Sequence, residues 1–469
     1  GLQDDGEVGG RSGGERDPLL QHAREPAADK EEEYFTYDVL LLCIITALLF
    51  ADQNLMAPNL TQIARDFGFS DEDRDRKLGG EIALGFFVLG GPVALTIGYL
   101  ADMMPRKMLF VTVVFLGEIP CLATIFVTEY WQLFVLRALT GIAIGGAPPL
   151  IFSLLGDMYG IKSRTHLSAS IMAVAAIGVS MGQLVSGLVG PTYGWRLPFL
   201  IIAIPATLLN VLFWLTFVEP KRGYADLKQM GPQSEITDYT EKISWGKAVG
   251  IFTVPTNIII FLQGVPGCLP WAVTITFLND YLAQEKQMTV EHSTVVLTCY
   301  NLGILGGVIF GGVVGQLIYN FKASLIAILM GVTTFLGIFP LLWLIYLPVP
   351  TPPLLEIIAV ALIGGLFTGV TGPCIRAVLL NVNMPETRGS AQALLTLTDD
   401  LGKGLGPLFM ALMIIGLHGR LVAMSMAVFF GWLLCSILLC TLVFTIDGDQ
   451  DNALHRLESG KGARKICLP

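Results

Sequence analysis

The sequence contains 469 residues, of which 53% are hydrophobic and only 14% are charged, and its net charge is -9 at pH 7. This composition is too apolar for an ordinary soluble protein, and no basic patch indicates nucleic-acid binding. Apolar runs of about eighteen or more residues recur along the chain and predict an all-α, polytopic membrane protein without a sizeable soluble domain.

Residues 1–37 are rich in Gly, Asp, Glu and Arg and contain too few apolar residues to form a core, so we expect a disordered cytoplasmic tail. Within it, the stretch from Glu15 to Leu20 reads ERDPLL. An acidic residue four positions before a Leu pair resembles the dileucine signal that sorting adaptors read toward lysosome-like organelles. A chance match is the alternative, because so short a motif recurs easily. The motif favours a lysosomal, vacuolar or other endomembrane location and leaves the plasma membrane open.

Six spans are predicted after the tail and form a first bundle over residues 38–218. They cover residues 38–58, 79–101, 108–128, 131–154, 167–190 and 197–218. A polar cytoplasmic linker is expected at 219–250. A second bundle follows over 251–446, with spans at 251–283, 292–318, 322–346, 353–381, 389–415 and 420–446, and residues 447–469 form a second tail.

Lys and Arg are more frequent in the connectors on the side of the two tails, which places both termini in the cytoplasm. The first outer loop opposes this orientation, because it contains Arg65, Arg74, Arg76 and Lys77.

The stretch from Arg137 to Arg164 has a degenerate copy later in the chain. At one fixed offset, the copy repeats two glycines, a proline and an arginine: Gly141, Gly145, Pro149 and Arg164 correspond to Gly365, Gly369, Pro373 and Arg388. Such a duplicated apolar segment predicts an interrupted helix that lines a transport pathway where two repeats meet.

A tight connector between the second and third spans reads GYLADMMPRK and begins at Gly98. Asp102 supplies a carboxylate, and Arg106 and Lys107 supply cations. Opposite charges at the ends of two helices can hold them together through charge-assisted hydrogen bonds, so we interpret this connector as a cytoplasmic latch that breaks when the protein changes state. A generic positive loop is the alternative, but it does not account for Asp102.

This connector is similar to the signature of the major facilitator superfamily, and Arg137 with Gly141 and Gly145 resembles the signature of its fourth span. The resemblance covers residues 38–446. It implies twelve helices in two pseudo-symmetric six-helix bundles, alternating access, and a monomer. The first span (FADQNLMAPNL) and the eleventh (TDDLGKGLGP) most resemble Spinster-like lysolipid and sphingolipid transporters. That family shows an Asp-Arg pair in the first span and a Glu in the fourth, where this chain has Asp52-Gln53 and Ile144.

Charged residues inside predicted spans are the other functional signal, because each costs at least about 2.5 kcal/mol at the centre of a bilayer unless it is paired or hydrated. In the first half these residues are Asp52, Glu118 and Arg137. A titrating carboxylate beside a fixed cation predicts a proton-linked switch. A permanent structural ion pair is the alternative.

In the second half, Arg376 follows Pro373 and is the expected anchor for a carboxylate or phosphate of the substrate. Asp399 and Lys403 lie four residues apart, can pair on one helix face, and are further candidates for the substrate site. The group is completed by Gln53, Trp271 and Phe277, although the two aromatic residues could equally belong to an interfacial belt.

No zinc, phosphate-loop or nucleotide motif is visible, so neither a metal nor a cofactor is expected, and the chain is not expected to be an enzyme. The sequence predicts a secondary transporter of an amphipathic or anionic organic solute, with a lysophospholipid or sphingolipid favoured and protons as the coupling ion. The alternatives are an organic-anion or sugar symporter of the same fold, and a receptor or scaffold that does not transport.

Overall fold

The structure is a computed structural model that describes residues 25–158, 161–219, 250–383, 387–417, 419–453 and 455. Over these residues the chain is almost entirely helical. Twelve stretches of the described chain are long and apolar enough to cross a membrane. The all-α class and the twelve predicted spans are therefore confirmed.

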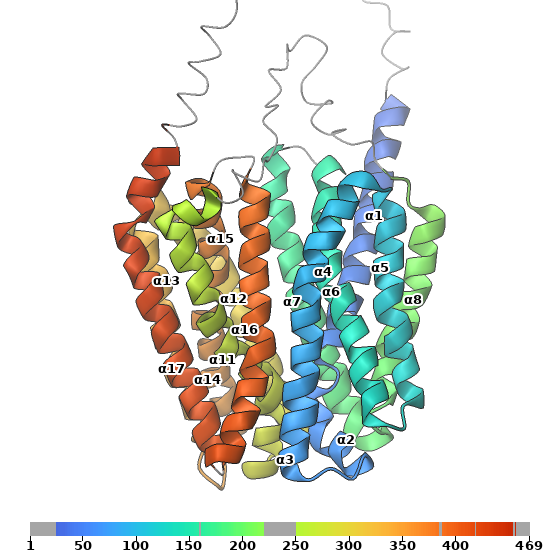
Figure 1. Cartoon of the computed structure of the whole chain (residues 1–469). Helices are drawn as coiled ribbons and strands as arrows, with labels where there is room; N and C mark the ends of the chain where they lie inside the picture. The colour runs from blue at the N-terminus through green and yellow to red at the C-terminus, as the bar shows by residue number, and fades with distance from the viewer. Residues whose placement is uncertain are drawn as a thin grey trace, which may run out of the picture.

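The helices form two groups that stand side by side (Figure 1). The first group consists of α1 (Glu25–Ala51), α4 (Ile82–Met103), α5 (Arg106–Ala123), α6 (Tyr130–Met158), α7 (Ile161–Tyr193) and α8 (Leu197–Thr216). The second consists of α11 (Pro255–Glu285), α12 (Val290–Phe321), α13 (Leu325–Ile345), α14 (Leu354–Gly369), α15 (Thr371–Val382), α16 (Arg388–Leu417) and α17 (Arg420–Thr441). Short helices α2 (Leu60–Asp66) and α3 (Asp71–Asp73) and a π-helical segment, η4 (Arg74–Glu81), connect α1 to α4.

The two ends of the molecule differ. The start of α1 and the end of α17 lie at the upper end in Figure 1, which we call the termini end. Helices α2 and α3 lie at the opposite end, which we call the loop end. The six-residue match at Glu15–Leu20, residues 1–24 of the first tail, most of the second tail and most of the linker fall outside the described residues. Residues 25–37, which the sequence assigned to the disordered tail, form the first part of helix α1 in the structure.

The buried apolar side chains divide into three clusters. One contains only first-half residues such as Phe110 and Leu154, and another contains only second-half residues such as Val378 and Leu439. The third joins both halves and includes Phe199 and Phe277. The halves therefore share a core toward the loop end and keep separate cores toward the termini end.

The duplicated glycines perform the same packing role in each half. A Cβ atom on Gly141 of α6 would lie 2.1 Å from the carbonyl oxygen of Phe86 in α4. A Cβ atom on Gly365 of α14 would lie 2.0 Å from the carbonyl oxygen of Tyr300 in α12. Close approach of backbones at small residues is how membrane helices pack most tightly. Each half thus uses its copy to bring one helix pair into backbone contact.

The predicted interruption occurs in one copy. Helix α14 ends at Gly369 and α15 begins at Thr371, so the second copy is broken. The first copy runs as a single helix from Tyr130 to Met158, with Pro148 and Pro149 inside it. The first half has its break elsewhere, in the first span.

Candidate functional site

The regular helix α1 ends at Ala51, in the middle of the predicted first span. Asp52–Asn54 form a short 3₁₀ turn, and a second such turn, Ala57–Asn59, contains Pro58, which has no N–H to donate. Helix α7 holds this irregular backbone in place. The Ser186 hydroxyl donates to the Leu55 carbonyl, and the Asn59 amide donates to the Ser186 carbonyl at 2.9 Å.

The break places Asp52 beside two residues of α5. The Cys121 thiol donates to Asp52 Oδ1 at 3.1 Å. One ligand atom from each of Asp52, Glu118 and Cys121 lies within 4.8 Å of the others, and all three residues are buried. Asp52 Oδ2 and both Glu118 oxygens have no hydrogen-bond partner among the described residues. Two ionised carboxylates at this spacing in a buried site repel each other strongly, so the arrangement favours a proton held between them.

Asp52, Glu118 and Cys121 could also coordinate a metal ion, although the sequence led us to expect none. The nearby Arg137 guanidinium opposes a further positive charge, and a proton is therefore the simpler occupant.

Arg137 of α6 reaches the same break from another side. Its Nη2 donates to the backbone carbonyl of Asp52 at 2.6 Å, and the guanidinium lies over the rings of Phe86 and Phe199, at 5.0 and 5.7 Å from their centroids. Arg137 Nε and Nη1 have no described partner, and Arg137 forms no ion pair with a described carboxylate. The structural ion pair considered as the alternative for Asp52 and Arg137 is therefore absent between these two described residues.

A cavity of about 50 Å³ lies against this group. Its lining includes Gln53 and Asn54 from the break, Phe87 from α4, Arg137 from α6 and Thr276 from α11. A space of this size admits a water molecule or a carboxylate group but not a whole organic solute. The cavity therefore lies between Arg137 and the break in the first half and Thr276 in the second half.

In the second half, Lys403 pairs with Asp400 rather than with Asp399. The Lys403 Nζ to Asp400 Oδ1 distance is 2.8 Å. Asp400 faces α4, where its Oδ2 lies 3.9 Å from a Cβ placed on Gly91, whereas Asp399 Oδ1 lies 3.1 Å from a Cβ placed on Gly264 of α11. The predicted pairing of Asp399 with Lys403 was wrong. Successive residues on a helix point about 100° apart, and it is Asp400, three residues before Lys403, that faces the Lys403 side chain.

Lys403 also connects the halves. Its Nζ lies 5.9 Å from the ring centroid of Phe87 in the first half and 5.9 Å from that of Trp271 in the second. Phe87 belongs to the cavity lining, so Lys403 and half-buried Trp271 extend the site beyond the cavity.

Two further residues predicted to bind substrate, Arg376 and Phe277, have other contacts in the structure. Arg376 Nη1 donates to Gln392 Oε1 at 3.3 Å. Phe277 is fully buried, and its ring lies 2.3 Å from a Cβ placed on Gly79 of the other half. The prediction that Phe277 lines a substrate pocket is wrong for this conformation, because the side chain packs between the two halves.

The connector that the sequence predicts to be a latch has a partner that the sequence pattern did not reveal. Glu219, just after α8, accepts hydrogen bonds from the backbone N–H groups of Arg106 and Lys107 at 2.9 and 3.2 Å, and from Arg106 Nε at 3.3 Å. A carboxylate at this position satisfies free N–H groups at the start of α5 and complements its dipole. Lys107 Nζ donates to the Phe217 carbonyl at 2.5 Å. The side chain of Asp102 lies outside the described residues, and Gly98 is a backbone position within α4.

A polar link between the halves was also missed. Gln183 Oε1 of α7 accepts from Asn54 Nδ2 at 2.9 Å and from Asn301 Nδ2 of α12 at 3.3 Å. Amides give no charge signal in an apolar run, so only their position in space reveals them. Cys121 could have been found, because it follows Glu118 by three residues and shares its helix face.

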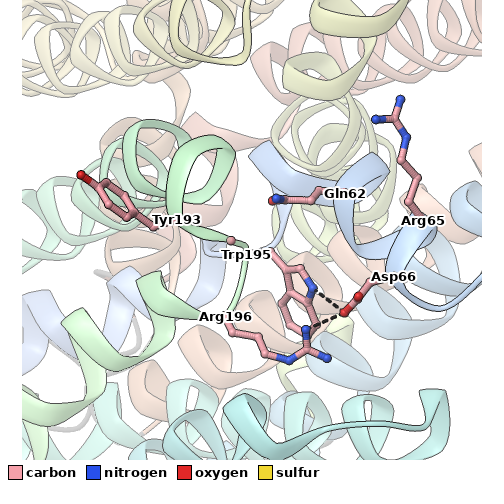
Figure 2. A pocket seen from close by; sticks show the side chains of 7 residues that line it. Gln62, Arg65, Asp66, Tyr193, Trp195 and Arg196 are labelled. Atoms are coloured by element: carbon pink, nitrogen blue, oxygen red, sulfur yellow. Dashed lines mark hydrogen bonds and ion pairs between the residues drawn. The ribbon is translucent and has the colours of Figure 1, made fainter.

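A larger, open hollow lies away from this chemistry. It measures about 490 Å³, and Figure 2 shows the side chains that line it, among them Gln62 and Asp66 of α2, which lies at the loop end. Asp66 Oδ2 accepts from Trp195 Nε1 at 3.1 Å and from Arg196 Nη1 at 2.5 Å. These bonds fix the turn between α7 and α8, and residues of the first half alone line the hollow.

Comparison with known proteins supports the fold. A profile described as Major Facilitator Superfamily matches residues 42–343. The gallate transporter of Pseudomonas putida is 29% identical over 310 residues, which are 59% of this chain and 65% of that protein. The 4-hydroxybenzoate transporter PcaK of Pseudomonas aeruginosa is 31% identical over 195 residues, covering 40% and 41%. Protein spinster homolog 3 of Danio rerio is 25% identical over 281 residues, covering 59% and 55%. The chain thus aligns with less than two thirds of each of these relatives.

Among solved structures, a bacterial homolog to the human lysosomal transporter Spinster, in an inward-facing and unoccupied conformation, has a TM-score of 0.69 and 21% identity. The match covers 90% of this chain and 98% of that one. The nucleoside transporter NupG has a TM-score of 0.61 and 17% identity, with 87% and 98% covered. At these identities the likeness shows the fold.

Proposed function

The chain belongs to the Major Facilitator Superfamily and has the fold of its transporters, and from this premise we propose that it moves an organic anion across a membrane by alternating access, coupled to protons. Its relatives and fold are those of transporters and not of enzymes. The coupling ion, the chemical class of the substrate and the membrane are parts of this proposal.

One observation carries the proton coupling: the buried carboxyl groups of Asp52 and Glu118 meet at the break in the first span. Their three unpartnered oxygens cannot all carry charge in this setting without a large desolvation and repulsion cost. Hydration of the site in another conformation would reduce that cost and let the proton leave. Such a difference in proton affinity between two states is what coupling requires.

Arg137 links the proton to the substrate in this proposal. Two of its guanidinium nitrogens are without a described partner, and the side chain lines the cavity. While Asp52 and Glu118 hold a proton, the guanidinium is available to an anionic group. When the proton leaves, the ionised Asp52 carboxylate competes for the same guanidinium and favours release.

An anionic solute with an aromatic or apolar body fits the surroundings of Arg137. Gln53, Phe86 and Phe87 border the cavity, and Lys403 extends the site past Phe87 toward Trp271. Two relatives are named for gallate and 4-hydroxybenzoate, both aromatic carboxylates. Arg376 and Asp399 lie in the second half, and we propose that they adjust the charge of the site when the halves move.

The test is uptake into proteoliposomes that contain the purified full-length chain, with an imposed pH gradient and labelled 4-hydroxybenzoate. We expect gradient-driven accumulation, and we expect Asp52→Asn and Glu118→Gln to abolish the response to the gradient. The matched control is Glu356→Gln, which removes an exposed carboxylate from the first turn of α14.

If Asp52→Asn and Glu118→Gln respond to the gradient as the unchanged protein does, the carboxyl pair does not carry the coupling proton. If Arg376→Ala leaves affinity unchanged while Arg137→Gln abolishes it, the anion anchor lies in the first half. Absence of uptake for every solute tried would favour the non-transporting receptor or scaffold.

A lysophospholipid or sphingolipid-like substrate is the second candidate. The fold likeness to the Spinster homolog supports it, as does a cation placed near two aromatic rings, Phe87 and Trp271, which suits an amphipathic molecule. Lysophosphatidylcholine offered in the same vesicles separates the two candidates. Selective transport of the lysolipid would replace the aromatic acid as the substrate class.

We further propose that both termini are cytoplasmic, that the loop end faces the lumen or the exterior, and that the protein acts as a monomer. A sorting adaptor at Glu15–Leu20 would direct it to a lysosomal or vacuolar membrane. Replacement of Leu19 and Leu20 by Ala tests this, with relocation of a tagged chain to the plasma membrane as the expected result.

A further inference from the structure

Four charged residues from both halves meet at the loop end: Arg74, Asp75, Asp280 and Arg420, which we call the loop-end cluster. Arg420, at the start of α17, binds both oxygens of Asp75 in η4, with an Nε to Oδ2 distance of 2.9 Å. Its Nη1 donates to Asp280 Oδ2 of α11, also at 2.9 Å. One arginine thus holds a carboxylate from each half.

The first half completes the cluster with a second arginine. Arg74 Nε donates to Asp75 Oδ1 at 3.0 Å and lies 3.8 Å from Asp280 Oδ2. Thr61 of α2 donates to Asp280 Oδ1 through its backbone N–H, at 3.2 Å, and its hydroxyl, at 2.6 Å. The cluster therefore contains two positive and two negative side chains, and its carboxylate oxygens are fully engaged.

The cluster is buried. The four side chains of Arg74, Asp75, Asp280 and Arg420 are 7%, 4%, 2% and 4% exposed, respectively. Charges removed from water attract each other strongly when they are paired, and a single unpaired member is costly. By contrast, the Arg196 pair with Asp66 at the same end is 35% and 45% exposed and joins residues of one half.

The surrounding packing shows what the cluster closes. The cluster lies at the end where the halves share an apolar core, next to the contact of Phe277 with Gly79. Toward the termini end each half keeps its own core. Opening a path from the loop end to the cavity at Arg137 would require α17 and α11 to leave η4 and α2, which breaks every ion pair between the halves in the cluster.

We propose that the loop-end cluster is the gate of the transport pathway on the side opposite the termini, with Arg420 as the residue that holds it shut. The proposal rests on the proposed alternating-access transport, but it does not rest on the proposed proton and substrate roles. Arg74 is one of the cations that opposed the predicted orientation, and its place in the cluster explains why a cation stands in that loop.

The experiment measures access to a reporter cysteine in place of Ala83, a buried residue that lines the cavity. A membrane-impermeant maleimide is added to the loop-end side of sealed, oriented vesicles, and labelling of the chain without the reporter is subtracted. We expect slow labelling of the reporter chain. Arg420→Gln should accelerate labelling by at least about tenfold, because it leaves the buried carboxylates of Asp75 and Asp280 without this partner in the closed state, which costs more than the free energy of one decade. Arg420→Lys should be intermediate, since it keeps the charge and loses the paired geometry.

Arg196→Gln is the matched control and should leave the labelling rate unchanged. Size-exclusion chromatography reports whether each variant is folded, and Asp280→Asn, which keeps an oxygen for Thr61, replaces Arg420→Gln if the latter is aggregated. Equal labelling rates for the gate variant and the reporter chain overturn the proposal. So does an equal acceleration by Arg196→Gln, which would indicate general loosening of the loop end.

Discussion

Gly141→Ala tests the packing that positions Arg137. An ideal Cβ at this position lies 2.1 Å from the Phe86 carbonyl oxygen, and ordinary contact begins at 3.4 Å. The difference, 3.4 minus 2.1, requires α6 to move away from α4 by about 1.3 Å. The obstructing atom belongs to the backbone, so no side-chain rotation relieves the contact. Overpacking of this kind costs about 1–3 kcal/mol.

The same displacement affects the site. Arg137 lies about one helical turn before Gly141, and its Nη2 is 2.6 Å from the Asp52 carbonyl. A shift of about 1.3 Å along that bond lengthens it to about 3.9 Å, which is beyond hydrogen-bonding distance. We therefore expect reduced stability and reduced uptake together.

Thermal unfolding of the purified protein in detergent, followed by fluorescence, measures the first effect, and the vesicle uptake assay measures the second. Gly312→Ala is the control, because its Cβ would meet no atom within 4 Å and it lies inside α12. Alanine there should be neutral or stabilising by up to about 1 kcal/mol. If Gly141→Ala unfolds at the same temperature as Gly312→Ala, the close approach of α6 and α4 does not limit stability and the reasoning fails.

Two further substitutions test the contact of Glu219 with the start of α5 and the packing of Phe277 between the halves. Glu219→Gln should lower the free energy of unfolding by about 1–2 kcal/mol, because the start of α5 loses charge-assisted bonds; an unfolding midpoint equal to that of Glu356→Gln would contradict this role. Phe277→Ala should cost about 3–5 kcal/mol of stability and leave substrate affinity in the surviving folded protein unchanged. Weakened affinity with unchanged stability would restore Phe277 to the substrate site.

The sequence identified several residues that the structure brings together. Asp52, Glu118 and Arg137 stand out as charges in apolar runs, and the structure brings all three to the break in the first span. Their contacts could not be read from the sequence. Arg137 binds the backbone carbonyl of Asp52, and Glu118 of α5 supplies the second carboxyl group. The fourth span has Ile144 at the position where the resemblance implied an acid.

The latch and the gate illustrate the same limit. Arg106 and Lys107 were recognisable from their spacing in the connector, but Glu219 lies more than one hundred residues away in the chain. Asp75 and Arg420 are 345 residues apart. No local pattern relates such positions, because only the packing of the two halves makes them neighbours.

The sequence by itself determined that the chain lies in a lipid membrane, that it has twelve spans and that one segment is repeated. These features could be read because hydropathy and small-residue spacing act over one helix at a time. The tertiary structure decided which side chains meet. A helix turns by about 100° per residue, so one step along the chain sends Asp399 toward α11 and Asp400 toward α4 and Lys403. Helix rotation and axial offset are set by contacts between helices, and these decided the partners of Lys403, Arg137 and Arg420.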